Sequence, residues 1–281
     1  MKTDRRLWLK ALAALPLAAA VPARADGLET IRQRGRLRIA IYNDFPPYGQ
    51  AGGKGIDADL ARAIAEKLGL APEIVGFNAD EDMNDDLRNM VWKGHYLGTQ
   101  PADLMMHVPV DEYLAKANDK VRIFGAYHRE TLALARDPAR IQALSGSAAI
   151  ALEVFTREKI GVETASLADS FLLSVLNGRL RENVVHFKNV AEAAKALAEG
   201  SITAVLAPRG ELEAALKGNS RLVIETPKMA ELKIEGWPLG MAVKVEEQAL
   251  AEAVGGALAE LKRNGTVAAI FKRHGISYLP A

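Results

Sequence analysis

The sequence predicts an α/β fold arranged as two lobes linked by a hinge. Apolar runs of strand length alternate with amphipathic segments of helix length, and this alternation starts afresh near Ile141. The chain has 281 residues, which is enough for two lobes of about 100 to 150 residues each. Its 49% hydrophobic and 25% charged residues are typical of a globular protein.

The first part of the chain has the pattern of a strand–helix–strand unit. Residues 36–42 are apolar β-formers and predict a buried parallel strand, which ends in a loop containing Pro46, Pro47 and Gly49. Leucine and isoleucine recur at helical spacing over residues 58–68, so a helix is expected there. Around this unit the sequence predicts a helix over 28–34, strands over 73–77 and 102–108, a helix over 80–93, and strands over 121–124 and 131–135, the last of which crosses between the lobes.

The later part of the chain repeats the alternation without repeating the sequence. Residues 148–152 predict a strand, followed by a turn at 153–156 and a helix. Asn264 and Gly265 mark the end of a long amphipathic helix. The remaining expected elements are strands over 184–187, 202–207 and 239–243, and helices over 190–199, 246–262 and 267–274.

The first 25 residues have the pattern of a signal peptide that is removed on export. Basic residues precede an apolar stretch over 11–21, and Ala23-Arg24-Ala25 fits a signal-peptidase site. The apolar stretch is shorter than the roughly 20 residues that span a bilayer. Residues 4–10 also resemble the twin-arginine motif, so the route, Sec or twin-arginine, stays open. The protein is therefore expected in the periplasm.

Charge and composition exclude several classes of function. Removing residues 1–25 takes away five basic residues and one acidic residue, which changes the net charge from +1 to −3, so nucleic-acid binding is not expected. The absence of cysteine excludes disulfides, thiolate metal sites, a cysteine nucleophile and a lipid anchor on cysteine. The five histidines have no metal-ligand spacing, so neither a metal nor a cofactor is expected.

Three blocks of sequence, within 37–61, 190–205 and 240–271, follow one another in a characteristic order. Together they resemble the bacterial extracellular solute-binding proteins of family 3, which include the amino-acid receptors of ABC importers. The resemblance implies a two-lobed, type II-like periplasmic binding protein whose lobes rotate about crossing strands to bury a ligand. The implied parts are lobe 1 at 26–132 plus 240–281, lobe 2 at 133–239, and hinges near Ala133 and Gly240.

The same resemblance implies a function, with one departure. The chain is expected to be a monomer and not an enzyme, and to present a small-molecule ligand to the membrane subunits of an ABC importer. In the family's amino-acid receptors, an arginine after the strand matching 102–108 holds the ligand carboxylate, and an aspartate after the strand matching 202–207 holds its ammonium group. This chain has no arginine over 108–112 and has Ala207-Pro208-Arg209 at the second place, so an ordinary α-amino acid is not the expected ligand.

Two other functions stay open. The segment 92–109 is similar to a branch encoded with periplasmic quinoprotein dehydrogenases, which implies an accessory or maturation protein with such a dehydrogenase as its partner. A few relatives dehydrate cyclic carboxylates, so a cyclohexadienyl-dehydratase-like enzyme is the second alternative. That chemistry needs a positioned acid or base and an anion clamp.

Ligand contacts are expected in the loops after the strands, because open α/β sheets bind ligands beyond the carboxyl ends of their strands. The loops after 36–42 and 102–108, the turn at 153–156 and the start of the helix after 202–207 supply the candidates. The predicted ligand-binding residues are Asn43, Phe45, Tyr48, His107, Asp111, Glu153, Phe155, Thr156 and Arg209. Each has a structural alternative: an aromatic ring that packs its loop, a histidine hydrogen-bonded in the core, or an arginine on a helix surface.

Overall fold

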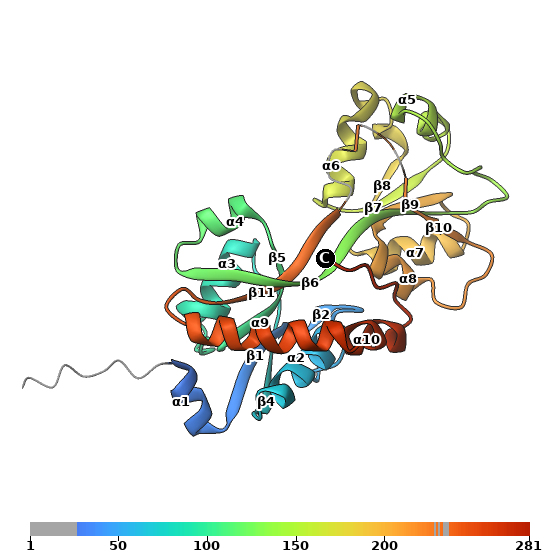
Figure 1. Cartoon of the computed structure of the whole chain (residues 1–281). Coiled ribbons are helices and arrows are strands. Elements are labelled where there is room, and N and C mark those ends of the chain that lie inside the picture. Colours follow the sequence, from blue (N-terminus) through green and yellow to red (C-terminus); the bar gives the residue numbers. More distant parts are fainter. Residues whose placement is uncertain (1–26, 228, 230, 233–235) are drawn as a thin grey trace, which may run out of the picture.

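Two α/β lobes are joined by a pair of long strands, as predicted (Figure 1). The computed structural model describes residues 27–227, 229, 231–232 and 236–281, so the predicted signal peptide over 1–25 lies outside the described residues. Among the described residues, nine strands form one mixed sheet in the order β4-β1-β5-β11-β6-β9-β7-β8, with β10 paired to β6. None of the helices in these ranges is long and apolar enough to cross a membrane.

The first lobe takes its elements from both ends of the chain. Its strands are β1 (Arg36–Tyr42), β2 (Asp44–Phe45), β3 (Gly49–Gln50), β4 (Ala71–Phe77) and β5 (Leu104–Pro109), and its helices are α1 (Gly27–Arg34), α2 (Ile56–Lys67), α3 (Met83–Leu87), α4 (Glu112–Ala117), α9 (Gln248–Arg263) and α10 (Thr266–His274). The second lobe contains β7 (Ile160–Glu163), β8 (Val184–Phe187), β9 (Ala204–Pro208), β10 (Val223–Glu225), α5 (Ala148–Ala151), α6 (Leu167–Ser174), α7 (Val190–Ala198) and α8 (Arg209–Ala215).

The crossing strands are β6 (Val121–Arg136) and β11 (Gly236–Lys244), green and orange in Figure 1. They pair antiparallel from Val121 to Thr131, and from Leu132 onward β6 pairs with β9 of the second lobe. The two short strands expected over 121–124 and 131–135 are therefore parts of one strand. Because β6 hydrogen-bonds in both lobes, the interlobe connection is a continuous backbone ladder.

The central strands bury both of their faces, which explains their apolar composition. Along β1, Leu37, Ile39 and Ile41 pack in the cluster that contains α2, α9 and α10, while Ala40 and Tyr42 pack in the cluster beneath α3. Alternate residues thus serve opposite layers of helices, as the two-residue period of a strand requires. The second lobe has its own two core clusters.

The core clusters suggest where the lobes divide. Leu132 packs in a second-lobe cluster, whereas Leu239 packs in the first-lobe cluster. We propose that the boundary crosses β6 and β11 next to these two residues, within one residue of the hinges expected near Ala133 and Gly240.

One predicted strand is wrong. Residues 148–152 form α5 (Ala148–Ala151), which Ser147 precedes, and a 3₁₀ turn (Glu153–Thr156) follows. Three of the four residues of α5 are alanine, the strongest helix former, and this local preference outweighs the apolar run. The strand of this part of the sheet is instead β7, which ends eleven residues after the end of the predicted strand.

His128 on β6 makes folding stability dependent on pH. Its ring is 2% exposed and packs against Phe271 at 4.4 Å between ring centroids, and burial lowers its pKa from 6.5 to about 4. Between about pH 6.5 and 4, the unfolded chain therefore binds a proton on this imidazole that the folded chain does not bind. The free energy of unfolding accordingly decreases as pH falls through this range.

The variant His128→Phe keeps the ring stack and removes this titration. We expect the slope of unfolding free energy against pH between 6.5 and 4 to decrease by up to about 1.4 kcal/mol per pH unit. Chemical denaturation at a series of pH values measures the slope. An unchanged slope in the variant would contradict the assignment.

Candidate functional site

Two cavities, with volumes of about 390 and 400 Å³, lie between the lobes, and a third of about 280 Å³ lies on the second lobe beside Trp237 of β11. All three have Glu163 in their walls. We call them together the cleft. The 400 Å³ cavity is lined by Tyr42, Asp44, Phe45, His107, Trp237 and Leu239, among others. Because its wall combines the first lobe, the end of β7 and a crossing strand, a change in lobe angle changes its volume.

His107 reaches the cleft through a bulge in β5. The pairing of β5 with β11 joins Val108 to Gly240 and Met106 to Met241, so His107 has no partner on β11. Its φ of 62° lies in the left-handed region, which non-glycine residues rarely adopt. Such a bulge re-aims the side chain of the extra residue, and the imidazole lines the 400 Å³ cavity.

A fully buried carboxylate holds this imidazole. Asp57, in the first turn of α2, is 0% exposed. His107 Nδ1 lies 3.0 Å from Asp57 Oδ2, and the Tyr127 hydroxyl donates to Asp57 Oδ1 at 2.6 Å. Burial, and then the charge of Asp57, raise the pKa of Tyr127 well above its usual value, so this phenol stays a donor. The cluster fixes the imidazole from behind the cleft wall.

A second buried carboxylate connects the two lobes. Glu130 on β6 is 2% exposed, and its Oε2 accepts from the Tyr48 hydroxyl of the first lobe. Its Oε1 accepts from the backbone N–H of Thr131 at 2.8 Å and of Gly210 on α8 at 3.4 Å. We call these residues, Tyr48, Glu130 and Gly210, the hinge contact. Burial raises the pKa of Glu130, although these hydrogen bonds oppose the shift.

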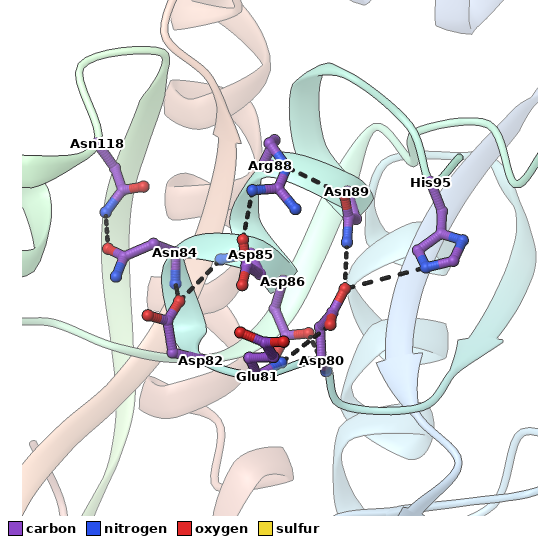
Figure 2. A network of polar contacts seen from close by, with 10 residues as sticks. All are labelled: Asp80, Glu81, Asp82, Asn84, Asp85, Asp86, Arg88, Asn89, His95 and Asn118. Carbon is purple, nitrogen blue, oxygen red and sulfur yellow. Dashed lines mark hydrogen bonds and ion pairs between the residues drawn. The ribbon is translucent and has the colours of Figure 1, made fainter. Parts of the chain in front are cut away.

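An acidic segment that leads into α3 forms a network of polar contacts in the first lobe (Figure 2). Asp82 caps α3 by accepting from the N–H groups of Asn84 and Asp85 at 2.8 and 3.0 Å. Asp86 accepts from the Tyr42 hydroxyl at 2.7 Å, and burial raises the pKa of Asp86. Asp86 thus holds the wall residue Tyr42, and Asp82 caps the helix on which Asp86 lies. Among the described residues, no group of three or more histidine, aspartate or glutamate side chains is placed to hold a metal.

Two of the predicted site residues line the cleft. Phe45 contributes to the 390 and 400 Å³ cavities, and its ring stands edge-on to His107 at 4.9 Å between centroids. Tyr48 lies behind them, 1% exposed, where it forms the hinge contact. Trp237 on β11 lines two of the cavities.

The structure places the other six predicted residues away from these cavity walls. Two of them have local roles in the first lobe: the Asn43 amide donates to Asn78, and Asp111 caps α4 through the Leu114 N–H at 2.8 Å. In the second lobe, Glu153 pairs with Arg179, Phe155 is in the core at 0% exposure, Thr156 donates to the Glu153 carbonyl, and Arg209 bonds Glu213 and Thr226. The wrong strand at 148–152 explains three of these, because it moved the expected loop eleven residues upstream.

The sequence reasoning missed Glu163 and Glu211. Glu163 ends β7, and Glu211 lies in the first turn of α8. The signal for Glu163 was present, since Ile160-Gly161-Val162 is a short apolar run followed by polar residues. Nothing in the sequence alone distinguishes Glu211 from other helix-surface glutamates.

Comparison with known proteins gives a consistent fold. No protein-family model matches the chain. A stretch of 56 residues is 45% identical to a probable amino-acid ABC transporter periplasmic-binding protein of Sinorhizobium fredii, covering 18% of each chain. An ancestral cationic amino acid solute-binding protein has 19% identity and a TM-score of 0.68 over 89% of this chain and 99% of its own. An ABC uptake transporter substrate-binding protein from Streptococcus pneumoniae, with bound histidine, has 17% identity and a TM-score of 0.63 over 92% and 99%.

These likenesses confirm the predicted fold. The chain has the two-lobed architecture of periplasmic binding proteins, and the relatives reported above are described as amino-acid-binding or substrate-binding proteins. The narrower likeness to a quinoprotein-associated branch stays a prediction.

The hinge contact predicts a specific steric coupling. A Cβ at Gly210 would overlap the Tyr48 hydroxyl oxygen, so Gly210→Ala is expected to lower the unfolding free energy by about 1–3 kcal/mol. Tyr48→Phe removes the overlapping oxygen. The loss of unfolding free energy in the double variant should therefore be smaller than the sum of the losses in the two single variants.

A double-mutant cycle by chemical denaturation measures this coupling. Gly255→Ala in α9 is the control, because nothing lies within 4 Å of its added Cβ and alanine stabilises a helix interior by about 0.5–1 kcal/mol. Strictly additive losses for Gly210→Ala and Tyr48→Phe would show that the two residues do not touch in solution.

Proposed function

We propose that this chain, which has the two-lobed fold of the periplasmic solute-binding proteins, captures a small molecule in its cleft and delivers it to an ABC importer. The observation that carries the proposal is the 400 Å³ cavity whose walls come from both lobes and from β11. A volume of this size suits a metabolite, since small-molecule sites occupy about 300–1,000 Å³. The export signal expected in the sequence and the likeness to importer proteins support the same role.

Within this proposal, three kinds of side chain bind the ligand. Phe45 and Trp237 give apolar walls from the first lobe and from the crossing strand. His107, held by Asp57, gives a polar group of fixed orientation. Lobe rotation about β6 and β11 closes these walls on the ligand.

Binding without catalysis fits the cleft better than dehydration of a cyclic carboxylate. An ancestral binding protein that is described as a precursor of cyclohexadienyl dehydratase shares the fold, with 19% identity and a TM-score of 0.60. A carboxylate substrate needs a cationic clamp, and none of the arginines in the part of the chain that the structure describes lines the three cavities. The acids that line them, Glu163 and Glu211, would repel such a substrate.

A second candidate is the accessory role for a periplasmic dehydrogenase. Tyr96 and Leu97 are 88% and 76% exposed on the segment that suggested this branch, and adjacent exposed apolar side chains are typical of a docking surface. Co-purification of a quinoprotein dehydrogenase from native extracts, lost in Tyr96→Ser combined with Leu97→Ser, would support it. Normal complex formation by this variant would contradict it.

Solute capture predicts a ligand-dependent rise in thermal stability. A ligand at 100 times its Kd adds about 2.7 kcal/mol to the unfolding free energy, and for a chain of this size each kcal/mol shifts Tm by about 2–4 °C. A thermal-shift screen with metabolites of positive, negative and no net charge measures this effect, and small-angle scattering then measures lobe closure with each hit.

Trp237→Ala should weaken binding about tenfold or more, because it removes an aromatic wall of two cavities. Tyr96→Ala, an exposed aromatic outside the cleft walls, is the matched control and should bind normally. Solute capture is rejected when no solute of any charge raises Tm or closes the lobes.

A further inference from the structure

Three carboxylates face the cleft without a protein partner. Glu163 lines all three cavities, Glu211 lines the 390 and 280 Å³ cavities, and Asp44 lines the 390 and 400 Å³ cavities. Among the described residues, none donates a hydrogen bond to these carboxylates or forms an ion pair with them. They come from both lobes, since Asp44 follows β1 while Glu163 and Glu211 belong to β7 and α8. Their oxygens therefore have free capacity toward the cleft.

This lack of partners contrasts with the other interior carboxylates. Asp57 accepts from Tyr127 and contacts His107, and Glu130 accepts three hydrogen bonds. For Glu211, burial and then the charges of Glu163 and Glu130 raise the pKa well above its usual value. Burial also raises the pKa of Glu163. Both carboxyl groups thus lose their protons less readily in the empty cleft than in water, and a cation bound beside them would stabilise their charged forms.

The basic side chains in or near the cleft are either paired with other residues or exposed to solvent. His107 is held by Asp57, and His274 lies 2.9 Å from Asp59. Lys217 lines only the 390 Å³ cavity and is exposed. Arg209, two residues from Glu211, turns its guanidinium to Glu213 and Thr226.

Helices α6 and α7 both begin at the cleft, and in each the side chain that caps the helix accepts from one of the first N–H groups. The N-terminus of a helix ordinarily favours a negative group. In α6, Asp169 already supplies one: its Oδ2 accepts from the Ala165 N–H at 2.9 Å, and the Asp169 N–H donates to Ser166 Oγ at 3.1 Å. A ligand carboxylate would therefore find fewer free donors at the start of α6 than at an uncapped helix.

The remaining wall is aromatic. Tyr42, Phe45 and Trp237 line the cavity that also contains Asp44 and Glu163. Aromatic faces attract organic cations by about 0.5–2 kcal/mol per contact, and most strongly where water is excluded. Carboxylates and rings in one cavity are the combination that recognises an amine or guanidinium group.

From this geometry we infer that the cleft binds a small organic cation that carries no carboxylate group, with Glu163 and Glu211 as its counterions and the three rings as its wall. This inference rests on the proposed capture function and specifies its substrate class. A basic amino acid satisfies only half of the site, because its α-carboxylate would lie near like charges, and no arginine or lysine among the described residues lines the 400 and 280 Å³ cavities.

Matched pairs of probes isolate the effect of the carboxylate. Agmatine is arginine without its carboxylate, and cadaverine is lysine without its carboxylate. Isothermal titration at pH 7.5 should give a Kd for each amine that is about tenfold or more below that of its amino acid, the cost of one unpaired buried charge being at least 1.4 kcal/mol. Tighter binding of arginine and lysine than of the amines would overturn the inference.

Two variants test whether Glu163 and Glu211 are the counterions of the bound cation. Glu211→Gln and Glu163→Gln should each weaken agmatine binding about tenfold or more. A carboxyl whose pKa is raised by folding costs stability above its unfolded pKa, so Glu211→Gln should also raise the Tm of the ligand-free protein at pH 7.5. Weaker binding together with higher stability distinguishes a ligand contact from a structural role. Glu182→Gln, an exposed change outside the cavity walls, is the control and should alter neither quantity.

The outcomes separate this inference from solute capture itself. When an anionic or neutral solute binds and closes the lobes while the amines do not bind, the substrate class is wrong and capture stands. When no probe of any charge binds, both fail. Agmatine binding that is unchanged in Glu163→Gln and in Glu211→Gln also overturns the inference, since the cation is then held elsewhere.

Discussion

The antiparallel pairing of β6 with β11 is the constraint on which the rest of the structure depends. These strands pair from Val121 to Thr131, and β6 then continues into the second lobe by pairing with β9. The C-terminal helices return to the first lobe because β11 leads there, so α9 and α10 pack on α2 although the sequence separates them by about 200 residues. One backbone ladder thus determines which residues share a core, which loops face one another, and the axis about which the lobes turn.

Buried carboxylates organise the space around this ladder. Glu130 is part of β6 and joins Tyr48 of the first lobe to Gly210 of the second. Asp57 lies behind the cleft wall and holds both His107 and Tyr127. Each of these carboxylates is supplied with donors, as burial of a polar group requires. They therefore fix the shape of the cleft from behind its walls.

The carboxylates at the cleft surface, by contrast, receive no hydrogen bond from the described residues. Glu163 and Glu211 lie in a partly enclosed region where no cation among the described residues pairs with either of them, and burial raises the pKa of both. This arrangement lowers the stability of the empty protein, and a ligand that restores the balance of charge is bound more tightly because of it. Most polar groups between the lobes have hydrogen-bond partners. The groups that lack a partner are the ones expected to determine which ligand a binding protein selects.

The sequence by itself determined the local elements and the class of fold. The apolar run of β1, the amphipathic pattern of α7 and the ends of α9 and α10 appear where the pattern predicts them, since these segments bury whole faces and their periodicity reports that burial. It also directed attention to Phe45 and His107, which follow or end strands of the sheet. The strand predicted over 148–152 is wrong because the apolar run indicated a buried strand, whereas the three alanines of α5 favour a helix.

Only the tertiary structure decided which polar groups meet in the cleft. Glu163 and Glu211 lie far from Asp44 and Trp237 in sequence, and they come together because of the strand order and the crossing of β6 and β11. Whether a carboxylate is paired depends on the same arrangement. No residue near Asp57 in sequence indicates that Tyr127 is its donor. Likewise, no residue near Glu211 indicates that the described part of the chain gives Glu211 no donor. Pairing is a property of neighbours in space, and the periodicity of a single chain carries no information about it.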